Sequence, residues 1–460
     1  MINNTITKYK SDKEFYKKLF LITLPIVLQS LITSSLNMLD TMMIGKVGEV
    51  ELASVGIANQ YYFLFSLLVN AIAIGSGVLI AQLWGKKDTE NVKRVLAKSL
   101  SYGLILTILF IALGLIMTEN IMKIFSKDLD VINIGVDYLR IVIISYLFTT
   151  ISFTFSSGLR SIGNTKLPMY ASLIGLIVNG VLNTILIFGY FGFSPMGIKG
   201  AGIATLIARI VECLIITIAV YTKIDVLKLR FKDVFSLPKS LGNTLYKVTL
   251  PIFINEACWA FGNITYTAIY ASIGTGAAAS IQICSTIMNL FMIVTFGLAN
   301  ASVVIIGNEI GSNNEEKAIE SSKKISGVSM KISVLLAIFM ILTAKPIVSF
   351  FNVSEAVKIS SQYILYFYGA VMIFKVYNAV MIVGILRGGG DATFGSILQA
   401  ITLWTIGIPL AYFAANVLHL PVYLVVGFTV VEEIVKFIFM RKRFKSFKWI
   451  RNMVKEELAA

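Results

Sequence analysis

The sequence predicts an all-α polytopic membrane protein, in which twelve transmembrane helices form two six-helix bundles. Of its 460 residues, 57% are apolar and only 14% are charged, whereas about 25% of the residues of a soluble domain are charged. Runs of about 20 mainly apolar residues, enough to cross a bilayer, occur twelve times. Landmarks of the first six runs return in the last six at a nearly constant offset, which predicts two related halves.

The predicted spans are separated by charged or turn-rich breaks. Glycine and proline inside them are tolerated, because neighbouring helices can satisfy the freed backbone groups. The first run is too long for a signal peptide and has no A-x-A cleavage site, so we predict that it is a span. The twelve spans are predicted at residues 19–45, 57–83, 94–116, 132–160, 168–191, 198–222, 246–273, 278–306, 325–349, 357–386, 393–418 and 421–441.

The basic residues predict the orientation. If the N-terminus is cytoplasmic, 28 of the 40 lysines and arginines lie in inner segments and 6 lie in outer loops. This is the bias of the positive-inside rule. We therefore expect a multi-pass protein of the inner (plasma) membrane with both termini in the cytoplasm. The formal net charge of +15 then faces anionic membrane lipid, and no nucleic-acid partner is needed to explain it.

The internal repeat sets the expected architecture. Each half holds an even number of spans, so both halves enter the membrane from the same side. A pseudo-twofold axis along the membrane normal follows, as in transporters with parallel repeats. Two such bundles around a central cleft suit alternating access. The landmarks are Leu-Pro-Ile at 24–26 and 250–252, Gly85 and Gly311, and Arg160 and Arg387.

The repeat and the charge distribution together predict five segments. Residues 1–18 form a cytoplasmic N-terminal segment and residues 223–245 a basic cytoplasmic linker between the lobes. An N-lobe of spans one to six at 19–222 and a C-lobe of spans seven to twelve at 246–441 lie on either side of the linker, followed by a basic cytoplasmic tail at 442–460.

Several classes of chemistry are excluded by composition. With His419 as the single histidine, histidine metal sites and catalytic triads have no residues to use. The three cysteines form no C-x-x-C motif, and no G-x-x-x-x-G-K-[ST] phosphate loop occurs. We therefore expect no enzyme, no cofactor and no ATPase subunit.

At the repeated landmarks, the chain resembles the multidrug and toxic compound extrusion (MATE) family of secondary antiporters. The resemblance rests on the two Leu-Pro openings, the Asp-Thr-Met-Met-Ile-Gly stretch at 40–45, the charged glycine turns, and the Leu-Arg stretches after spans four and ten. It covers roughly residues 15–440. The resemblance implies a V-shaped pair of six-helix lobes and export of bulky, often cationic small molecules driven by inward H⁺ or Na⁺. We expect a monomer.

Asp40, Asn179 and Asn183 are the candidate coupling and binding residues of the N-lobe. Asn179 and Asn183 are four residues apart and share one helix face, and the resemblance places them beside Asp40 in the N-lobe cavity. Asp40 would carry the proton or bind Na⁺. The alternatives are an interfacial aspartate at the loop of Gly45, and asparagines that only hydrogen-bond between helices.

Glu256, Lys375 and Asn378 are the candidates in the C-lobe. Glu256 follows Pro251 by five residues, where a carbonyl freed by proline and a carboxylate could bind a cation such as Na⁺. Lys375 lies near the middle of span ten, close to Asn378, and could pair with Glu256 when the cleft is empty. Alternatively, Glu256 hydrogen-bonds to a neighbouring helix and Lys375 snorkels to the interface.

The other charges within spans are predicted to be structural. Pairs within one helix lower the cost of burying charge without any role in transport. The expected pairs are Arg209 with Glu212, three residues apart, and Glu432 with Lys436, four residues apart, which leaves Glu433 without a helical partner at a spacing of four. Arg160 and Arg387 are predicted to anchor the lobe ends or to bind lipid phosphate.

Other functions stay open at this point. A flippase for lipid-linked substrates would place several cationic residues in the cleft, where only Lys375 is a candidate. A membrane-bound transferase would need an acidic metal motif on an inner loop, and the acidic residues at 88–90 and 315–316 lie on solvated turns. A pore would show ohmic conductance instead of saturable exchange.

Overall fold

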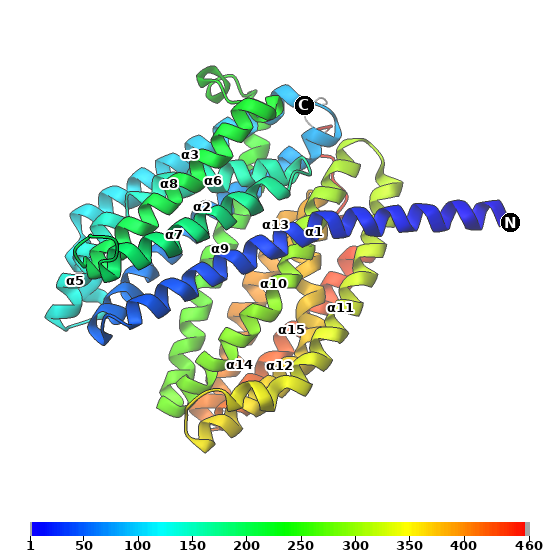
Figure 1. Ribbon diagram of the computed structural model, residues 1–460. Helices are drawn as coiled ribbons and strands as arrows, with labels where there is room; N and C mark the ends of the chain where they lie inside the picture. Colours follow the sequence, from blue (N-terminus) through cyan, green and yellow to red (C-terminus); the bar gives the residue numbers. More distant parts are fainter. Residues whose placement is uncertain (1, 456–460) are drawn as a thin grey trace. The chain divides into compact units, whose positions relative to one another are not determined.

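The computed structural model describes residues 2–455, with side chains from residue 12 onward, and every regular element in this range is a helix. The chain divides into two units (Figure 1). The N-unit is Leu24–Thr249, and the C-unit is the described part of Met1–Thr23 and Leu250–Ala460. The boundaries fall inside α1 (Ile2–Gly45) and α9 (Lys239–Ile273), next to the prolines of the two Leu-Pro-Ile landmarks.

Helices of the N-unit pack in the order expected of a bundle with short connections. α2 contacts α3, α5 and α6, and α8 packs against α7, α6 and α5. Its aromatic core includes Phe65 and Tyr146, whose stacked rings are 4.3 Å apart. Besides α1, the helices are α2 (Glu49–Gly85), α3 (Thr89–Ile116), α4 (Thr118–Phe125), α5 (Leu129–Val142), α6 (Ser145–Ser161), α7 (Lys166–Phe188) and α8 (Gly197–Lys223).

The C-unit repeats this packing with one difference, because π-helical turns interrupt its later helices. α12 contacts α11, α10 and α15. Besides α9, the helices are α10 (Thr275–Gly311), α11 (Glu315–Ser349), α12 (Glu355–Ala379), α13 (Ala392–Thr402), α14 (Ile408–Tyr412) and α15 (Val422–Lys445), with π-helical segments at Val380–Leu386, Leu403–Gly407 and Phe413–Val417.

The helices correspond to the twelve predicted spans. Nine described helices are long and apolar enough to cross a membrane, or ten when the bent pair α5 and α6 counts as one span. The remaining two predicted spans correspond to α9 and α15, with 35 and 24 residues, which are not among these helices. The predicted all-helical class is confirmed. The fourth span is not one straight helix, because α5 and α6 meet at 49°.

The repeat is visible in side-chain hydrogen bonds as well as in sequence. The hydroxyl of Ser54 on α2 donates to the carbonyl of Val131 on α5, at 3.0 Å. Ser280 on α10 donates to the carbonyl of Val357 on α12, at 3.4 Å. Both residues of the second bond lie 226 positions after their counterparts, so the two units repeat the same interhelical contact.

The charged glycine turns also have one structure. Asp88 caps α3 by accepting a hydrogen bond from the backbone N–H of Asn91, at 3.2 Å. Asn314, 226 positions later, caps α11 by accepting from the backbone N–H of Lys317, at 3.1 Å. Asp and Asn are preferred at this position because their side-chain oxygens satisfy an orphan backbone donor.

The segments that follow α8 in the N-unit and α15 in the C-unit each fold back onto their own unit. In the N-unit, short 3₁₀ turns at Asp225–Leu227 and Phe231–Val234 pack on α3, with Leu227 fully buried. In the C-unit, Trp449 is fully buried and the backbone N–H of Arg451 donates to the carbonyl of Gly389, at 2.8 Å. Both segments are therefore parts of a unit's core rather than free connections.

Candidate ion and substrate sites

Asp40, Asn179 and Asn183 form one hydrogen-bonded group in the N-unit. The amide of Asn183 on α7 donates to Oδ1 of Asp40 on α1, at 2.5 Å, and to Oδ1 of Asn179, at 3.0 Å. Both asparagines are fully buried, because spacing by four residues turns them to the same face of α7. The structure thus brings together the three residues that the sequence grouped; their role stays a prediction.

The group extends to α8 and contains an unused acceptor. The amide of Asn179 lies 3.4 Å from the hydroxyl of Thr205, to which it donates. Oδ1 of Asn183 is buried and has no hydrogen-bond partner among the described residues. Carboxylate, amide and hydroxyl oxygens are the ligands that hard cations prefer, so the group around Asp40 could hold a proton or Na⁺.

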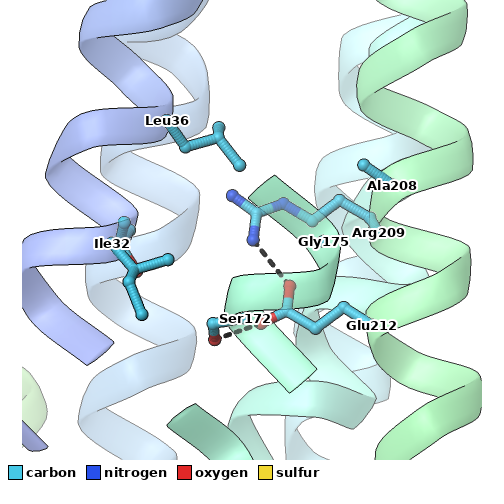
Figure 2. A pocket seen from close by; sticks show the side chains of 8 residues that line it. Ile32, Leu36, Ser172, Gly175, Ala208, Arg209 and Glu212 are labelled. Carbon is cyan, nitrogen blue, oxygen red and sulfur yellow. Dashed lines mark hydrogen bonds and ion pairs between the residues drawn. The ribbon is translucent and has the colours of Figure 1, made fainter. Parts of the chain in front are cut away.

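A second polar cluster of the N-unit surrounds Glu212. One carboxylate oxygen of Glu212 pairs with Arg209 at 2.8 Å, and the other accepts from the hydroxyl of Ser172 at 2.6 Å (Figure 2). The predicted Arg209–Glu212 pair is confirmed. Both side chains line a cavity of about 10 Å³ between α1, α7 and α8, which is room for about one water. Arg209 also acts electrostatically on Asp40.

In the C-unit, Glu256 pairs with Arg387 and not with Lys375. Nη2 of Arg387 lies 3.1 Å from Oε1 of Glu256. Arg387 is only 1% exposed, so the expectation that it binds lipid phosphate is wrong. The expected pairing of Glu256 with Lys375 is wrong as well, since the amine of Lys375 lies over the ring of Tyr368, 5.9 Å from its centre.

A π-helical segment separates Lys375 from Arg387. Counting 3.6 residues per turn predicts which side chains share a face only while the helix stays α-helical. Residues 380–386 form a π-helix, which adds residues per turn and changes the direction in which Arg387 points. The sequence contains no proline in this segment and gave no sign of the change.

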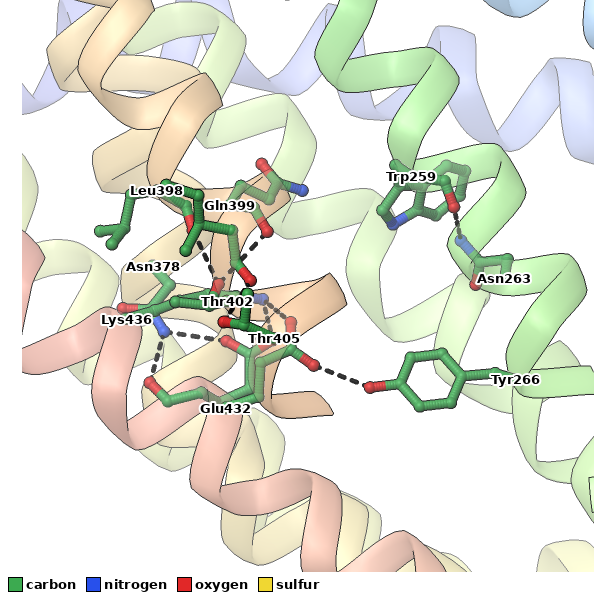
Figure 3. Close-up of polar contacts among 12 residues, drawn as sticks. Trp259, Asn263, Tyr266, Asn378, Leu398, Gln399, Thr402, Thr405, Glu432 and Lys436 are labelled. Carbon is green, nitrogen blue, oxygen red and sulfur yellow. Dashed lines mark hydrogen bonds and ion pairs between the residues drawn. The ribbon is translucent and has the colours of Figure 1, made fainter. Parts of the chain in front are cut away.

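A buried network on α15 joins three charged side chains of the C-unit. Nζ of Lys436 lies 2.5 Å from Oε1 of Glu432 and 3.1 Å from Oε1 of Glu433 (Figure 3). The hydroxyl of Tyr266 on α9 donates to Oε2 of Glu432 at 2.9 Å. The amide of Asn378 on α12 donates to Oε2 of Glu433 at 2.8 Å. The network therefore joins three helices.

This network confirms one prediction and extends it. The Glu432–Lys436 pair is confirmed, and Lys436 also contacts Glu433 at a spacing of three. Asn378 lies in contact with Glu433 and not with Glu256 in any described hydrogen bond. The sequence carried a signal for this network: Lys436 lies 227 positions after Arg209, the offset that also separates Arg160 from Arg387.

The geometry defines a class of protein. Each unit has membrane-spanning helices around a buried acidic and amide cluster, and charged groups inside a membrane mark pathways for ions and substrates. Within the described residues, no group of three or more His, Cys, Asp or Glu side chains that could hold a metal ion occurs. These features are typical of a multi-pass membrane transporter rather than an enzyme.

Comparison with known proteins gives the family. The MatE family profile matches residues 25–185 and 251–413, once in each half. The chain belongs to the MatE family and is a membrane transporter. It is similar to the uncharacterized transporter YisQ of Bacillus subtilis, with 25% identity over 461 residues that cover 98% of each chain. The probable multidrug resistance protein NorM of Thermotoga maritima is 24% identical, over 87% of this chain and 85% of NorM.

Solved structures share the fold. A crystal structure of MATE in complex with MaL6 superimposes with a TM-score of 0.85 and 20% identity, over 94% of this chain and 97% of that chain. A MOP superfamily transporter from Pyrococcus furiosus, described by the reverse polarity of its binding pocket, has a TM-score of 0.85 over 94% of this chain and 96% of that chain. The two-lobe fold of twelve spans is therefore confirmed.

Proposed function

We propose that this transporter is a secondary antiporter, which exports bulky cationic or hydrophobic organic compounds in exchange for inward H⁺ or Na⁺. The observation that carries the proposal is the Asp40 group of the N-unit. Among the described residues, the carboxylate of Asp40 accepts from the amide of Asn183 and forms no salt bridge, so it can gain or lose a cation without breaking an ion pair. Similarity to probable multidrug resistance proteins supports organic compounds as the cargo.

Coupling requires that ion and cargo oppose one another at linked sites. Binding of H⁺ or Na⁺ at Asp40 removes the negative charge that favours a cationic cargo, and release of the ion restores it. A proton that crosses 100 mV supplies about 2.3 kcal/mol, and each tenfold ratio of proton concentration adds about 1.4 kcal/mol. One ion per cycle therefore supports export of an uncharged cargo against a gradient of about a few hundredfold, whereas the membrane-potential contributions cancel for a monovalent cationic cargo.

We further propose a monomer in the inner (plasma) membrane, with both termini in the cytoplasm. Support comes from the excess of lysine and arginine in alternate connections. Labelling with membrane-impermeant cysteine reagents tests the orientation. Single cysteines are placed at residues 87 and 123 for this purpose. Labelling of position 123 alone in intact cells is expected, and labelling of position 87 alone would contradict it.

Transport into everted membrane vesicles, in which an exporter moves its cargo inward, tests the function. Ethidium, a fluorescent organic cation, is loaded by imposed pH and Na⁺ gradients that are varied separately. The native protein is expected to accumulate ethidium with one of the two gradients, and Asp40→Asn to lose this response. Asp130→Asn, the same change on an exposed residue, is the matched control. Equal gradient-driven transport by native protein and Asp40→Asn would contradict the proposal.

A further inference from the structure

We propose that Glu212 in the N-unit keeps Asp40 free for its ion and its cargo, because Glu212 holds Arg209 in a separate ion pair. Without Glu212, the guanidinium of Arg209 would become the counter-ion of Asp40. Glu212 is thus a positioning residue that acts through Arg209. The inference rests on the proposed antiport, in which Asp40 binds the coupling ion, and it gives a role to a pair that the sequence predicted to be structural.

Glu212 is fixed by contacts that involve three helices. Its Oε2 accepts from Nη1 of Arg209, on the same helix, at 2.8 Å, and its Oε1 accepts from the hydroxyl of Ser172 on α7 at 2.6 Å. The hydroxyl of Ser172 in turn accepts from the amide of Gln29 on α1, at 3.2 Å. Both carboxylate oxygens of Glu212 therefore have donors, and these contacts favour its ionised form.

Arg209 is held less firmly than Glu212. A guanidinium has five N–H donors, and Arg209 uses one of them in its hydrogen bonds to described residues, the bond to Glu212. This bond joins a base to an acid that follows it, which is the less favourable order on a helix. Figure 2 shows the guanidinium between Glu212 and Leu36 of α1, beside the cavity of about 10 Å³. Arg209 therefore has donors left for another acceptor.

The direction of the helix turns Arg209 toward the Asp40 group. Side chains on an α-helix lean toward its N-terminus, which for Arg209 is the direction of Thr205, four residues earlier. The hydroxyl of Thr205 accepts from the amide of Asn179, which belongs to the Asp40 group. On α1, Leu36 lies four residues, about one turn, before Asp40. A released guanidinium is therefore about one helical turn from an acid.

The C-unit shows that a base on the last helix can reach the level of the first-helix site. Tyr266 lies on the first helix of the C-unit, 226 positions after Asp40. Nζ of Lys436 reaches back four residues to Oε1 of Glu432, at 2.5 Å, and Oε2 of Glu432 accepts from the hydroxyl of Tyr266. The side chain of arginine is longer than that of lysine, so Arg209 can span the same four residues once it is released.

The charges of the cluster explain why this release matters. Asp40, Arg209 and Glu212 together carry one negative charge when all three are ionised. One H⁺, one Na⁺ or one singly charged cargo at Asp40 makes the cluster neutral, and net charge inside the membrane is costly. Removal of the charge of Glu212 makes the cluster neutral with no ion bound, because Arg209 then balances Asp40. The empty site would lose its attraction for the ion and for a cationic cargo.

The other ionisable groups that act on this pair are uncharged near neutral pH. Tyr62 on α2 and Tyr138 on α5 act electrostatically on Arg209. Cys213, the residue after Glu212, is coupled electrostatically to it. Tyrosine and cysteine side chains are neutral at pH 7, so none of the three can replace Glu212 as the partner of Arg209.

Asp40 is the acid toward which a released Arg209 would turn. It is the single acid on α1 within residues 24–45, and α6 and α7 have none. On α5, Asp137 pairs with Lys199 at 3.1 Å and Asp130 is exposed. The ionisable side chains of α6 and α7 are basic or phenolic: Tyr146, Arg160, Lys166 and Tyr170.

Infrared difference spectroscopy on the reconstituted full-length protein tests the inference with the proton as the probe and no cargo. Lowering the pH should produce the C=O band of protonated Asp40, which Asp40→Asn identifies by its loss. In Glu212→Gln, the pH of half-protonation of Asp40 should fall by about one unit or more, a tenfold loss of proton affinity, because Arg209 then stabilises the ionised form. Glu212→Asp keeps the charge and should stay near the native value.

The double variant Arg209→Gln/Glu212→Gln separates an effect through Arg209 from a structural effect. With both charges removed, half-protonation should return to the native pH or lie above it. Glu90→Gln, the same change in an exposed glutamate–arginine pair of the same unit, is the matched control and should equal the native protein.

Four results would overturn the inference. They are a native band that persists in Asp40→Asn, an unchanged half-protonation in Glu212→Gln, an equal downward shift in the double variant, and an equal shift in Glu90→Gln. If Glu212→Gln is not recovered as a monodisperse protein, Arg209→Gln answers the same question in the opposite direction. It leaves the charge of Glu212, so half-protonation of Asp40 should move to higher pH, and an unchanged or lower value contradicts the proposal.

The proposed antiport and this inference can fail separately. Absence of gradient-driven ethidium transport by the native protein would reject the antiport function alone, since the spectroscopic result does not depend on it. Transport by the native protein, together with equal half-protonation of Asp40 in the native protein and Glu212→Gln, would reject the role of Glu212 alone.

Discussion

The acidic clusters of the N-unit and the C-unit differ in where they keep their carboxylates. The N-unit has Asp40 on its first helix, and the C-unit has Tyr266 at the equivalent position and the two acids of its network, Glu432 and Glu433, on the last helix. In each unit, polar side chains of the first and last helices belong to one hydrogen-bonded group. The acid can therefore lie on either helix of a duplicated bundle, provided that the polar group is kept.

The surroundings of the acids differ as well. Amides surround Asp40, whereas Glu256, Glu432 and Glu433 each contact a basic residue. An acid paired with a cation is costly to disrupt, because removal of one partner leaves a buried charge. We therefore expect the N-unit acid to respond to substitution mainly in transport, and the C-unit pairs to respond also in stability.

The largest expected effect distinguishes the two equivalent positions on the first helix of each unit. Asp40→Asn should reduce gradient-driven ethidium transport by about tenfold or more, which corresponds to about 1.4 kcal/mol or more of coupling. Tyr266→Phe removes only a hydroxyl and should cause a smaller loss. Initial rates of transport in everted vesicles at equal protein content measure both. A larger loss with Tyr266→Phe would reverse the comparison.

The two arginines of the repeat should differ in stability. Arg387→Met leaves Glu256 without its partner and should cost about 3–5 kcal/mol, as broken buried pairs do. Arg160→Met removes only a hydrogen bond to the carbonyl of Ser156 within the same helix and should cost about 1 kcal/mol. Unfolding curves in detergent compare the variants. Double substitution of Glu256 and Arg387 by Gln and Met should recover part of the loss.

Two equivalent glycines should also differ. A Cβ at Gly407 would collide with Glu432 and with the hydroxyl of Tyr266, so Gly407→Ala should cost about 1–3 kcal/mol as overpacked sites do. Gly180, which lies 227 positions earlier, would meet only the end of the flexible Leu39 side chain, at 3.0 Å. Gly180→Ala should be less destabilising. Thermal unfolding of the two variants measures the difference, and equal losses would contradict it.

The smallest expected effect concerns the repeated serine contacts. Ser54→Ala and Ser280→Ala each remove one hydrogen bond between helices, and such bonds contribute about 0.6 kcal/mol on average in a membrane protein. The bond of Ser54 is 3.0 Å long and that of Ser280 is 3.4 Å, so we expect the loss to be larger for Ser54→Ala. Paired unfolding curves test the order of the two losses.

Much of the fold could be predicted from the sequence, since apolar runs and repeated landmarks report directly on spans and duplication. The helices begin and end within a few residues of most predicted boundaries. The bend between α5 and α6 could not be predicted, because it falls at Ile143 and Ile144, where no proline or glycine interrupts the apolar run. Packing against the rest of the unit fixes such a bend.

The sites could be predicted only in part. Asn179 and Asn183 share a face on a regular α-helix, so their spacing was enough to group them. Arg387 was predicted to lie in the turn after span ten, and its pairing with Glu256 comes from a contact between residues 131 positions apart that spacing along one helix does not report. The partners of Glu433 come from α12 and α15, and only the three-dimensional contact between these helices brings Asn378 to it.

The C-unit is built from residues far apart in the sequence. It includes the described part of Met1–Thr23 together with Leu250–Ala460, and Trp449 fills its interior. During synthesis the N-unit can close once residue 249 has left the ribosome, whereas the C-unit must wait for residues near 450 while its earliest helix is already in the bilayer. A truncated chain that lacks Trp449 would therefore contain a folded N-unit and an incompletely packed C-unit.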